Sequence, residues 1–169
     1  MKKILLITTV LVLFFVASCG YKFSGGGLLP EKTKLVAIEM FVNNTAETGA
    51  ENIFANALGI ELTQMSDSQV VKLKDADAYF KGVVKYISIS ALTKNSVDSV
   101  IERKVYAVID LQLVDKDGKI LWFAKDLKGR EEFQVTNVNL DDMSSRTKAV
   151  EKIAERLARK AVSRMLNDF

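Results

Sequence analysis

Apolar and polar positions separate most sharply at the start of the chain. Two lysines are followed by the apolar run Ile4–Val16, and the small residues Ala17 and Ser18 then precede Cys19. A positive start, a short apolar core and a small-residue end are the layout of a secretory signal peptide. The run is too short for a membrane-spanning helix, which needs about 20 apolar residues. The pattern therefore predicts that residues 1–18 are a leader, removed by cleavage between Ser18 and Cys19.

The next part of the chain predicts one strand and one helix. Leu35–Phe41 is almost entirely apolar, as expected of a strand that is covered on much of both faces. Residues 43–45 are Asn, Asn and Thr, which favour a turn. From Glu47 to Met65 apolar residues return at intervals of three and four, which predicts a helix whose start is capped by Thr45 or Thr48.

Alternation with a period of two then predicts three consecutive strands. In the first, Ala78–Thr93, the alternation changes phase near Tyr86, which indicates a β-bulge. The second, residues 100–114, alternates without a break, and the turn at residues 115–118 joins it to a return strand over residues 119–133. The residues of the second strand that are predicted to share one face are Val105, Ala107, Ile109, Leu111 and Leu113.

The C-terminal segment carries the strongest helical pattern in the chain. Asp141, Asp142 and Ser144 are candidate caps for its start. The apolar residues that follow recur at i, i+3, i+4 and i+7, which is the spacing of a single helix face. This face is expected to lie on the sheet. Its members are Val150, Ile153, Ala154, Leu157, Ala158, Ala161, Val162 and Met165.

The order of the predicted elements favours an α+β two-layer sandwich. Its four-stranded sheet is expected to be mainly antiparallel, with both helices on one face. Residues 35–169 form one domain, and residues 19–34 form the acylated N-terminus and a tether that is flexible at Ser24–Gly27. The other sheet face is expected to be more exposed, yet apolar enough to contact a partner or acyl chains. The apolar residues assigned to it are Tyr106, Val108, Ile120 and Trp122.

Composition argues against a nucleic-acid-binding protein and against an enzyme. Loss of Lys2 and Lys3 with the leader lowers the 24 basic residues to 22, against 21 acidic ones, so the net charge falls from +3 to +1. A nucleic-acid-binding protein would show a strong basic excess. The chain contains no histidine, the commonest general base and metal ligand, and nothing else is placed to activate a nucleophile. No metal or other cofactor is expected.

Cys19 is the only cysteine, and it follows the predicted cleavage site directly. Residues Val16–Cys19 resemble the signal of bacterial lipoproteins at every position. A cysteine thiolate can be alkylated to a thioether, so Cys19 can carry a diacylglycerol, and the amine freed by cleavage can take a further acyl chain. Two or more chains give stable membrane anchoring. The alternative is an ordinary signal peptide with a cysteine at that position by chance.

Four stretches resemble the lipopolysaccharide-assembly lipoproteins of Gram-negative outer membranes. They are Cys19–Phe23, Phe41–Thr45, Ala76–Gly82 and Leu113–Trp122. The resemblance implies two helices packed on a four-stranded sheet, and no catalytic residues. It further implies a non-enzymatic plug inside a large outer-membrane β-barrel translocon, which assists assembly of that barrel and delivery of lipopolysaccharide to the outer leaflet.

The same resemblance implies a location and a ligand. The protein would be lipid-anchored at the outer membrane, with its domain facing the periplasm or inside the barrel lumen. Gly20, rather than Asp, after the acylated cysteine fits export to the outer membrane. Family members have basic residues proposed to meet the phosphates of lipid A.

Basic residues gather on two of the predicted strands, where pairing through the hairpin would bring several of them to one end of the sheet. Such a group can bind the phosphates of a glycolipid through charge-assisted hydrogen bonds. The alternative is a solvated edge, where lysine prevents pairing between strands of different molecules. The candidate phosphate-binding residues are Arg103, Lys104, Lys125, Lys128 and Arg130.

The same sequence features are also compatible with a different function. A periplasm-facing lipoprotein that activates a peptidoglycan synthase, or that pilots a secretin, would share the β-α start and the Asn-Thr turn. The identity of the membrane partner discriminates between these readings. A β-barrel favours the first, and a synthase or a secretin favours the second.

Overall fold

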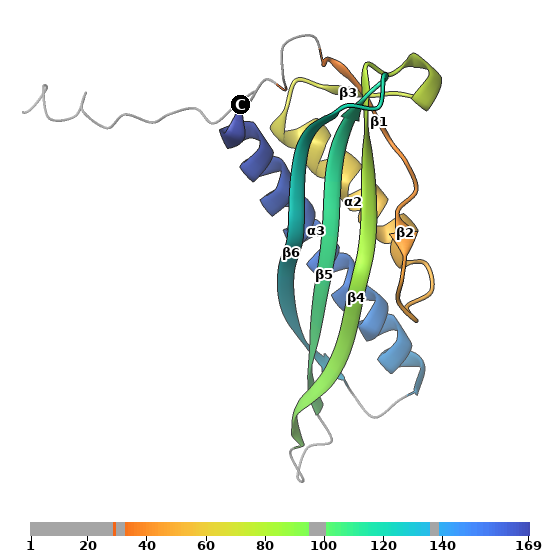
Figure 1. The fold of residues 1–169 in the computed structure, drawn as a ribbon. Helices are drawn as coiled ribbons and strands as arrows, with labels where there is room; N and C mark the ends of the chain where they lie inside the picture. The colour runs from red at the N-terminus through yellow and green to blue at the C-terminus, as the bar shows by residue number, and fades with distance from the viewer. Residues whose placement is uncertain (1–28, 30–32, 95–100, 136–138) are drawn as a thin grey trace, which may run out of the picture.

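The computed structural model describes residue 29 and residues 33–94, 101–135 and 139–169 (Figure 1). The predicted leader, the cleavage site at Ser18 and Cys19, and most of the predicted tether lie outside the described residues. Within the described part, a long curved sheet forms one layer and two helices form the other.

Three long strands dominate the sheet: β4 (Ala78–Lys94), β5 (Ile101–Asp115) and β6 (Ile120–Val135). They are antiparallel neighbours in the order β4-β5-β6. The predicted hairpin turn between β5 and β6 is confirmed. The Asp115 carboxylate accepts hydrogen bonds from the backbone N–H groups of Asp117 and Lys119, and Gly118 takes the positive φ of 88° that a tight turn requires.

Three short strands extend the sheet and add parallel pairings to it. β1 (Leu35–Ile38) pairs in parallel with β4 and with β3 (Gln69–Val70), and β2 (Val42–Asn43) also pairs in parallel with β4. The sheet is therefore mixed and six-stranded, in the order β3-β1-β4-β5-β6 with β2 beside β4. The prediction of four mainly antiparallel strands was wrong in this detail. A helical crossover between β1 and β4 returns the chain in the same direction, and two-residue strands are too short to produce a periodic pattern.

The helices α2 (Ala50–Met65) and α3 (Asn139–Asp168) cover the same face of the sheet, as predicted (Figure 1). All eight apolar residues of the predicted C-terminal stripe are buried, from Val150 to Met165. They lie in one cluster with the five alternating residues of β5 from Val105 to Leu113, which are also buried. Both periodic patterns are thereby confirmed. Fully burying a leucine-sized side chain is worth roughly 1.5–3 kcal/mol, so this interface contributes strongly to the stability of the fold.

Candidate functional site

The face of the sheet turned away from α2 and α3 has no covering layer among the described residues (Figure 1). This surface is called the outer face below. β5 is regular, so its even-numbered residues, alternating with the buried ones, lie on the outer face. Lys104, Tyr106, Val108, Asp110 and Gln112 are all partly exposed there. The outer face is thus a mixture of cationic, aromatic, aliphatic and acidic groups.

Two β-bulges lie side by side on the outer face. In β4 the register shifts between Val84 and Tyr86, which leaves Lys85 as the extra residue. In β6 the register shifts opposite Asp110 of β5, in the segment that contains Asp126. The predicted bulge in the first long strand is therefore confirmed and lies next to the expected Tyr86. A bulge bends a strand and re-aims its side chains, so both shifts turn polar groups toward β5.

The two bulges are joined by one polar cluster. The ammonium of Lys85 lies 2.6 Å from Asp126 Oδ1 and 3.4 Å from Asp110 Oδ2. The backbone N–H of Asp126 donates to the other carboxylate oxygen of Asp110 at 2.7 Å. Asp126 has a φ of 51°, in the left-handed region that non-glycine residues seldom adopt. These contacts link β4, β5 and β6 at the two bulges.

The charges in this cluster shift each other's titration. The hydrogen bond from Lys85 lowers the pKa of Asp126, and the nearby ammonium groups of Lys125 and Lys128 lower it further. The hydrogen bond to Asp126 raises the pKa of Lys85, with a smaller contribution from Asp110. Asp126 is thus held in its charged form chiefly by Lys85, with smaller electrostatic contributions from Lys125 and Lys128.

The structure brings together most of the candidate phosphate-binding residues. Lys128 and Arg130 are exposed and pair in register with Val108 and Tyr106 of the outer face. Lys104 lies on the same face of β5, and Lys125 is exposed beside the bulge in β6. These four residues therefore share one surface. It includes an edge strand, because β6 ends the sheet.

Arg103 is separated from the other four candidates. It follows the alternation of the buried Val105, so it lies on the helix-covered face of β5, opposite to Lys104. The adjacent pair Arg103-Lys104 therefore does not act as one cluster. Adjacent residues of a regular strand point to opposite faces, whatever their shared charge.

Aromatic and aliphatic groups lie among the cations. The rings of Tyr86 and Tyr106 make an edge-on contact with centroids 6.1 Å apart. Tyr86 is 51% exposed and Phe123 is 42% exposed. Tyr86 lies on the outer face because the bulge at Lys85 changes the phase of β4 after the buried Phe80 and Val84.

Trp122 is a correction to the predicted outer face. It is buried, and its indole N–H donates to Asp168 Oδ2 at 2.8 Å near the end of α3. Ile120, assigned to the same face as Trp122, is 53% exposed. The register shift between Leu113 and Val114 inserts an extra residue into β6 between these two positions and reverses the phase.

A hollow of about 340 Å³, lined by both apolar and charged residues, adjoins the polar cluster on the outer face. Its apolar wall includes Met40, Val42 and Val83, and its polar lining includes Lys81 and Asp110. Met40 and Val42 are 67% and 57% exposed. The sequence pattern did not predict this hollow, because Met40 belongs to a run that indicates a strand covered on much of both faces.

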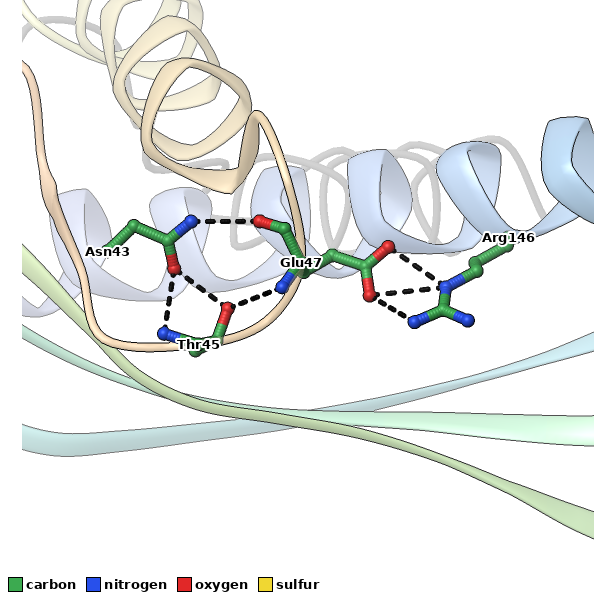
Figure 2. A network of polar contacts seen from close by, with 4 residues as sticks. All are labelled: Asn43, Thr45, Glu47 and Arg146. Atoms are coloured by element: carbon green, nitrogen blue, oxygen red, sulfur yellow. Dashed lines mark hydrogen bonds and ion pairs between the residues drawn. The ribbon is translucent and has the colours of Figure 1, made fainter.

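Phe41–Thr45, one of the stretches that carried the resemblance, contains β2 and the beginning of the turn that leads to α2 (Figure 2). The Asn43 side-chain oxygen accepts hydrogen bonds from the backbone N–H and the hydroxyl of Thr45, at 3.0 and 2.7 Å. The Asn43 amide donates to the carbonyl oxygen of Glu47 and to the Glu51 carboxylate, both at 2.8 Å. The Asn-Thr turn is thus an internally satisfied structural element.

The same network reaches the second helix. Arg146 of α3 donates to both carboxylate oxygens of Glu47, with the shortest contact at 2.6 Å (Figure 2). The Thr45 hydroxyl accepts the backbone N–H of Glu47. α2 itself begins at Ala50 after Gly49, which has a φ of 84° and provides no side-chain cap. The prediction that Thr45 or Thr48 caps α2 was therefore wrong, because Thr45 instead serves the turn before it.

Two further features are absent from the described residues. No group of three or more acidic or cysteine side chains there could hold a metal ion. None of the helices in that part of the chain combines the length and the hydropathy that a membrane-spanning helix requires.

The sequence matches the model of the LptE family, described as lipopolysaccharide-assembly, over residues 33–167. No curated protein gives a significant match. Among solved structures, a minor lipoprotein from Acinetobacter baumannii is 16% identical with a TM-score of 0.52, covering 80% of this chain and 92% of that one. A hypothetical protein from Chlamydia trachomatis is 10% identical with a TM-score of 0.50, covering 79% of this chain and 96% of that one. These likenesses are of fold alone.

Proposed function

The chain belongs to the lipopolysaccharide-assembly family of non-enzymatic lipoproteins, and from this premise we propose that it is a subunit of an outer-membrane lipopolysaccharide translocon. In this proposal it plugs a large β-barrel, assists assembly of that barrel, and helps to deliver lipopolysaccharide to the outer leaflet. Cys19 carries the diacylglycerol and the N-linked acyl chain that anchor it. The domain faces the periplasm or lies inside the barrel lumen.

The observation that carries the proposal is the open outer face of the sheet. A face that displays Tyr86, Tyr106 and Phe123 without a covering layer in the described structure suits contact with another molecule. Exposed cations on the neighbouring strand suit an anionic amphiphile, whose phosphates take the charge while its apolar part meets the aromatic rings. Lipid A offers this combination of groups.

Four of the predicted phosphate contacts remain in the proposal, and they are Lys104, Lys125, Lys128 and Arg130. Arg103 is left out because it lies on the other face of the sheet. Lys128 and Arg130 are the strongest pair, because both are exposed and follow each other along the outer face of β6. The hollow beside Met40 and Val42 offers an adjacent apolar surface.

Charge reversal tests the lipid contact. The double variant Lys128→Glu and Arg130→Glu is expected to weaken binding of lipopolysaccharide by the detergent-purified full chain. Lys152→Glu with Lys160→Glu, on the exposed side of α3, is the matched control, because it reverses the same number of charges away from the outer face. Equal binding by both double variants and the unmodified protein, with circular dichroism unchanged, would remove this contact from the proposal.

A further inference from the structure

The polar cluster at the two neighbouring bulges contains a negatively charged group of the protein itself, the carboxylate of Asp126. The Asp126 carboxylate contacts Lys85 at 2.6 Å, and Lys125 and Lys128 flank it on its own strand. Its side chain is 44% exposed, so the position is open to solvent. One carboxylate therefore pairs with the Lys85 ammonium on the outer face, and the exposed Lys125 and Lys128 lie one and two residues away along its own strand.

We propose that Asp126 is an internal competitor for a phosphate site formed by Lys85, Lys125 and Lys128. A phosphate group displaces the carboxylate of Asp126 from Lys85 and takes its place among the lysines. This inference rests on the proposed lipid-phosphate contact. It adds Lys85 to the residues of that contact, and it makes Asp126 a group within the protein that regulates phosphate binding there. No covalent bond forms or breaks in the exchange.

Charge and geometry favour the exchange. A phosphomonoester carries about −1.5 to −2 charges near neutral pH and three strong acceptor oxygens, whereas a carboxylate carries one charge and two oxygens. A phosphate can therefore engage several ammonium groups at once. In the resting protein, Asp126 lowers the net positive charge of the site and reduces its attraction for weaker anions.

Asp110 keeps the site assembled when Asp126 leaves Lys85. Its Oδ2 lies 3.4 Å from the Lys85 ammonium, and its Oδ1 accepts the backbone N–H of Asp126 at 2.7 Å. The backbone of the bulge is thus held by Asp110 and does not depend on the Asp126 side chain. Rotation of that side chain toward solvent breaks the pair between Lys85 and Asp126, while Lys85 keeps its longer contact with Asp110.

Asp126→Asn tests the competition, because it removes one charge and keeps the shape. Asparagine tolerates the left-handed φ of this position, and its backbone N–H can still bind Asp110. Two probes are titrated into the detergent-purified full chain: inorganic pyrophosphate, and micelles doped with diphosphoryl lipid A. Dephosphorylated lipid A gives the baseline for contacts that do not involve phosphate.

The variant is expected to bind phosphate-bearing lipid A roughly fivefold more tightly, the effect of one nearby unit charge in a water-like dielectric. Glu151→Gln is the matched control, because it removes one exposed carboxylate from α3, on the side of the sheet opposite to the outer face and to the candidate phosphate contacts. It is expected to change affinity by less than twofold. Adding Lys85→Met to Asp126→Asn is expected to abolish the gain.

A gain confined to Asp126→Asn supports the competition. A gain for both probes indicates recognition of phosphate itself, and a gain for lipid A alone indicates recognition of the lipid headgroup. An unchanged or weaker affinity of Asp126→Asn, an equal gain for Glu151→Gln, or a gain that survives loss of Lys85 overturns the proposed competition. The lipid contact would still stand in those cases if the Lys128 and Arg130 double variant binds lipopolysaccharide weakly. The lipid contact itself is contradicted if the Lys128 and Arg130 double variant binds lipopolysaccharide as tightly as the unmodified protein.

Discussion

Arg159 of α3 donates two hydrogen bonds to the carboxylate of Glu61 on α2, from Nε at 3.0 Å and from Nη2 at 2.8 Å. Glu61 is only 3% exposed, whereas the Arg159 side chain is 65% exposed. The arginine thus reaches from the surface to satisfy a buried charge between the helices. A bidentate arginine–carboxylate pair fixes both distance and orientation, so this contact sets how α2 and α3 lie against each other.

Arg159→Gln should lower the thermal unfolding midpoint, because it leaves the Glu61 carboxylate buried without its cation. The double variant Glu61→Gln with Arg159→Gln should recover part of the loss, because no buried charge is then left unpaired. Differential scanning calorimetry measures the thermal unfolding midpoints of the two variants and of the unmodified protein. A double variant less stable than Arg159→Gln alone would contradict this role for the pair.

Asn43→Ala should destabilise the fold by about 1–3 kcal/mol, because it leaves several partly buried polar groups without partners. Arg146→Ala removes the exposed contact of the same network with Glu47 and should cost less than about 1 kcal/mol. Chemical denaturation of both variants gives the comparison. Similar losses for the two would mean that the turn does not depend on the Asn43 side chain.

Gly82→Ala should cost about 1–3 kcal/mol, because the added methyl group overlaps the buried ring of Phe41. A Cβ at position 82 would lie 2.3 Å from Phe41 Cε2. Gly59→Ala is the control. There the nearest atom is the end of the Ile38 side chain at 3.3 Å, and alanine is favoured over glycine within a helix by up to about 1 kcal/mol. We expect the control to be neutral or stabilising in urea denaturation.

The pair Lys85–Asp126 predicts a pH dependence at both ends of the scale. The pKa of Asp126 is lowered from 3.8, so its contribution is present above that value and is lost as the pH falls through the lower folded-state pKa. The pKa of Lys85 is raised from 10.5, so its contribution is present below that value and is lost as the pH rises through the higher one. Both groups are solvent-accessible, so the effect is small and screened by salt.

Urea denaturation across the pH range measures this dependence. The stability difference between the unmodified protein and Asp126→Asn should be constant at intermediate pH and should shrink toward both extremes. High salt should reduce the difference throughout. A difference that grows on acidification would contradict the assignment of Asp126 as the stabilised carboxylate.

Local periodicity predicted much of the fold. The buried stripe of α3 and the alternation of β5 each follow from one regular element, which needs no information from elsewhere in the chain. The hairpin turn at Gly118 is equally local. The parallel pairings of β1, β2 and β3 depend on how α2 carries the chain back to the sheet, and two of these strands have only two residues each.

The candidate site was harder to predict for a related reason. Lys85 and Asp126 meet because bulges in two different strands fall beside the same residue of β5. An extra residue in β6 also turned Trp122 into the core and left Ile120 exposed. The partner of Glu61 is 98 residues away in sequence, so no local pattern distinguishes it from a solvated acid. Contacts set by bulges and by distant helices require the three-dimensional structure.

The identity of the protein that co-purifies with the full chain from native membranes in mild detergent tests the proposed function most directly. The proposal predicts an outer-membrane β-barrel as the principal partner in mass spectrometry, retained after washing with moderate salt. Recovery of a peptidoglycan synthase or a secretin in its place, with no such barrel, would contradict a role in lipopolysaccharide export.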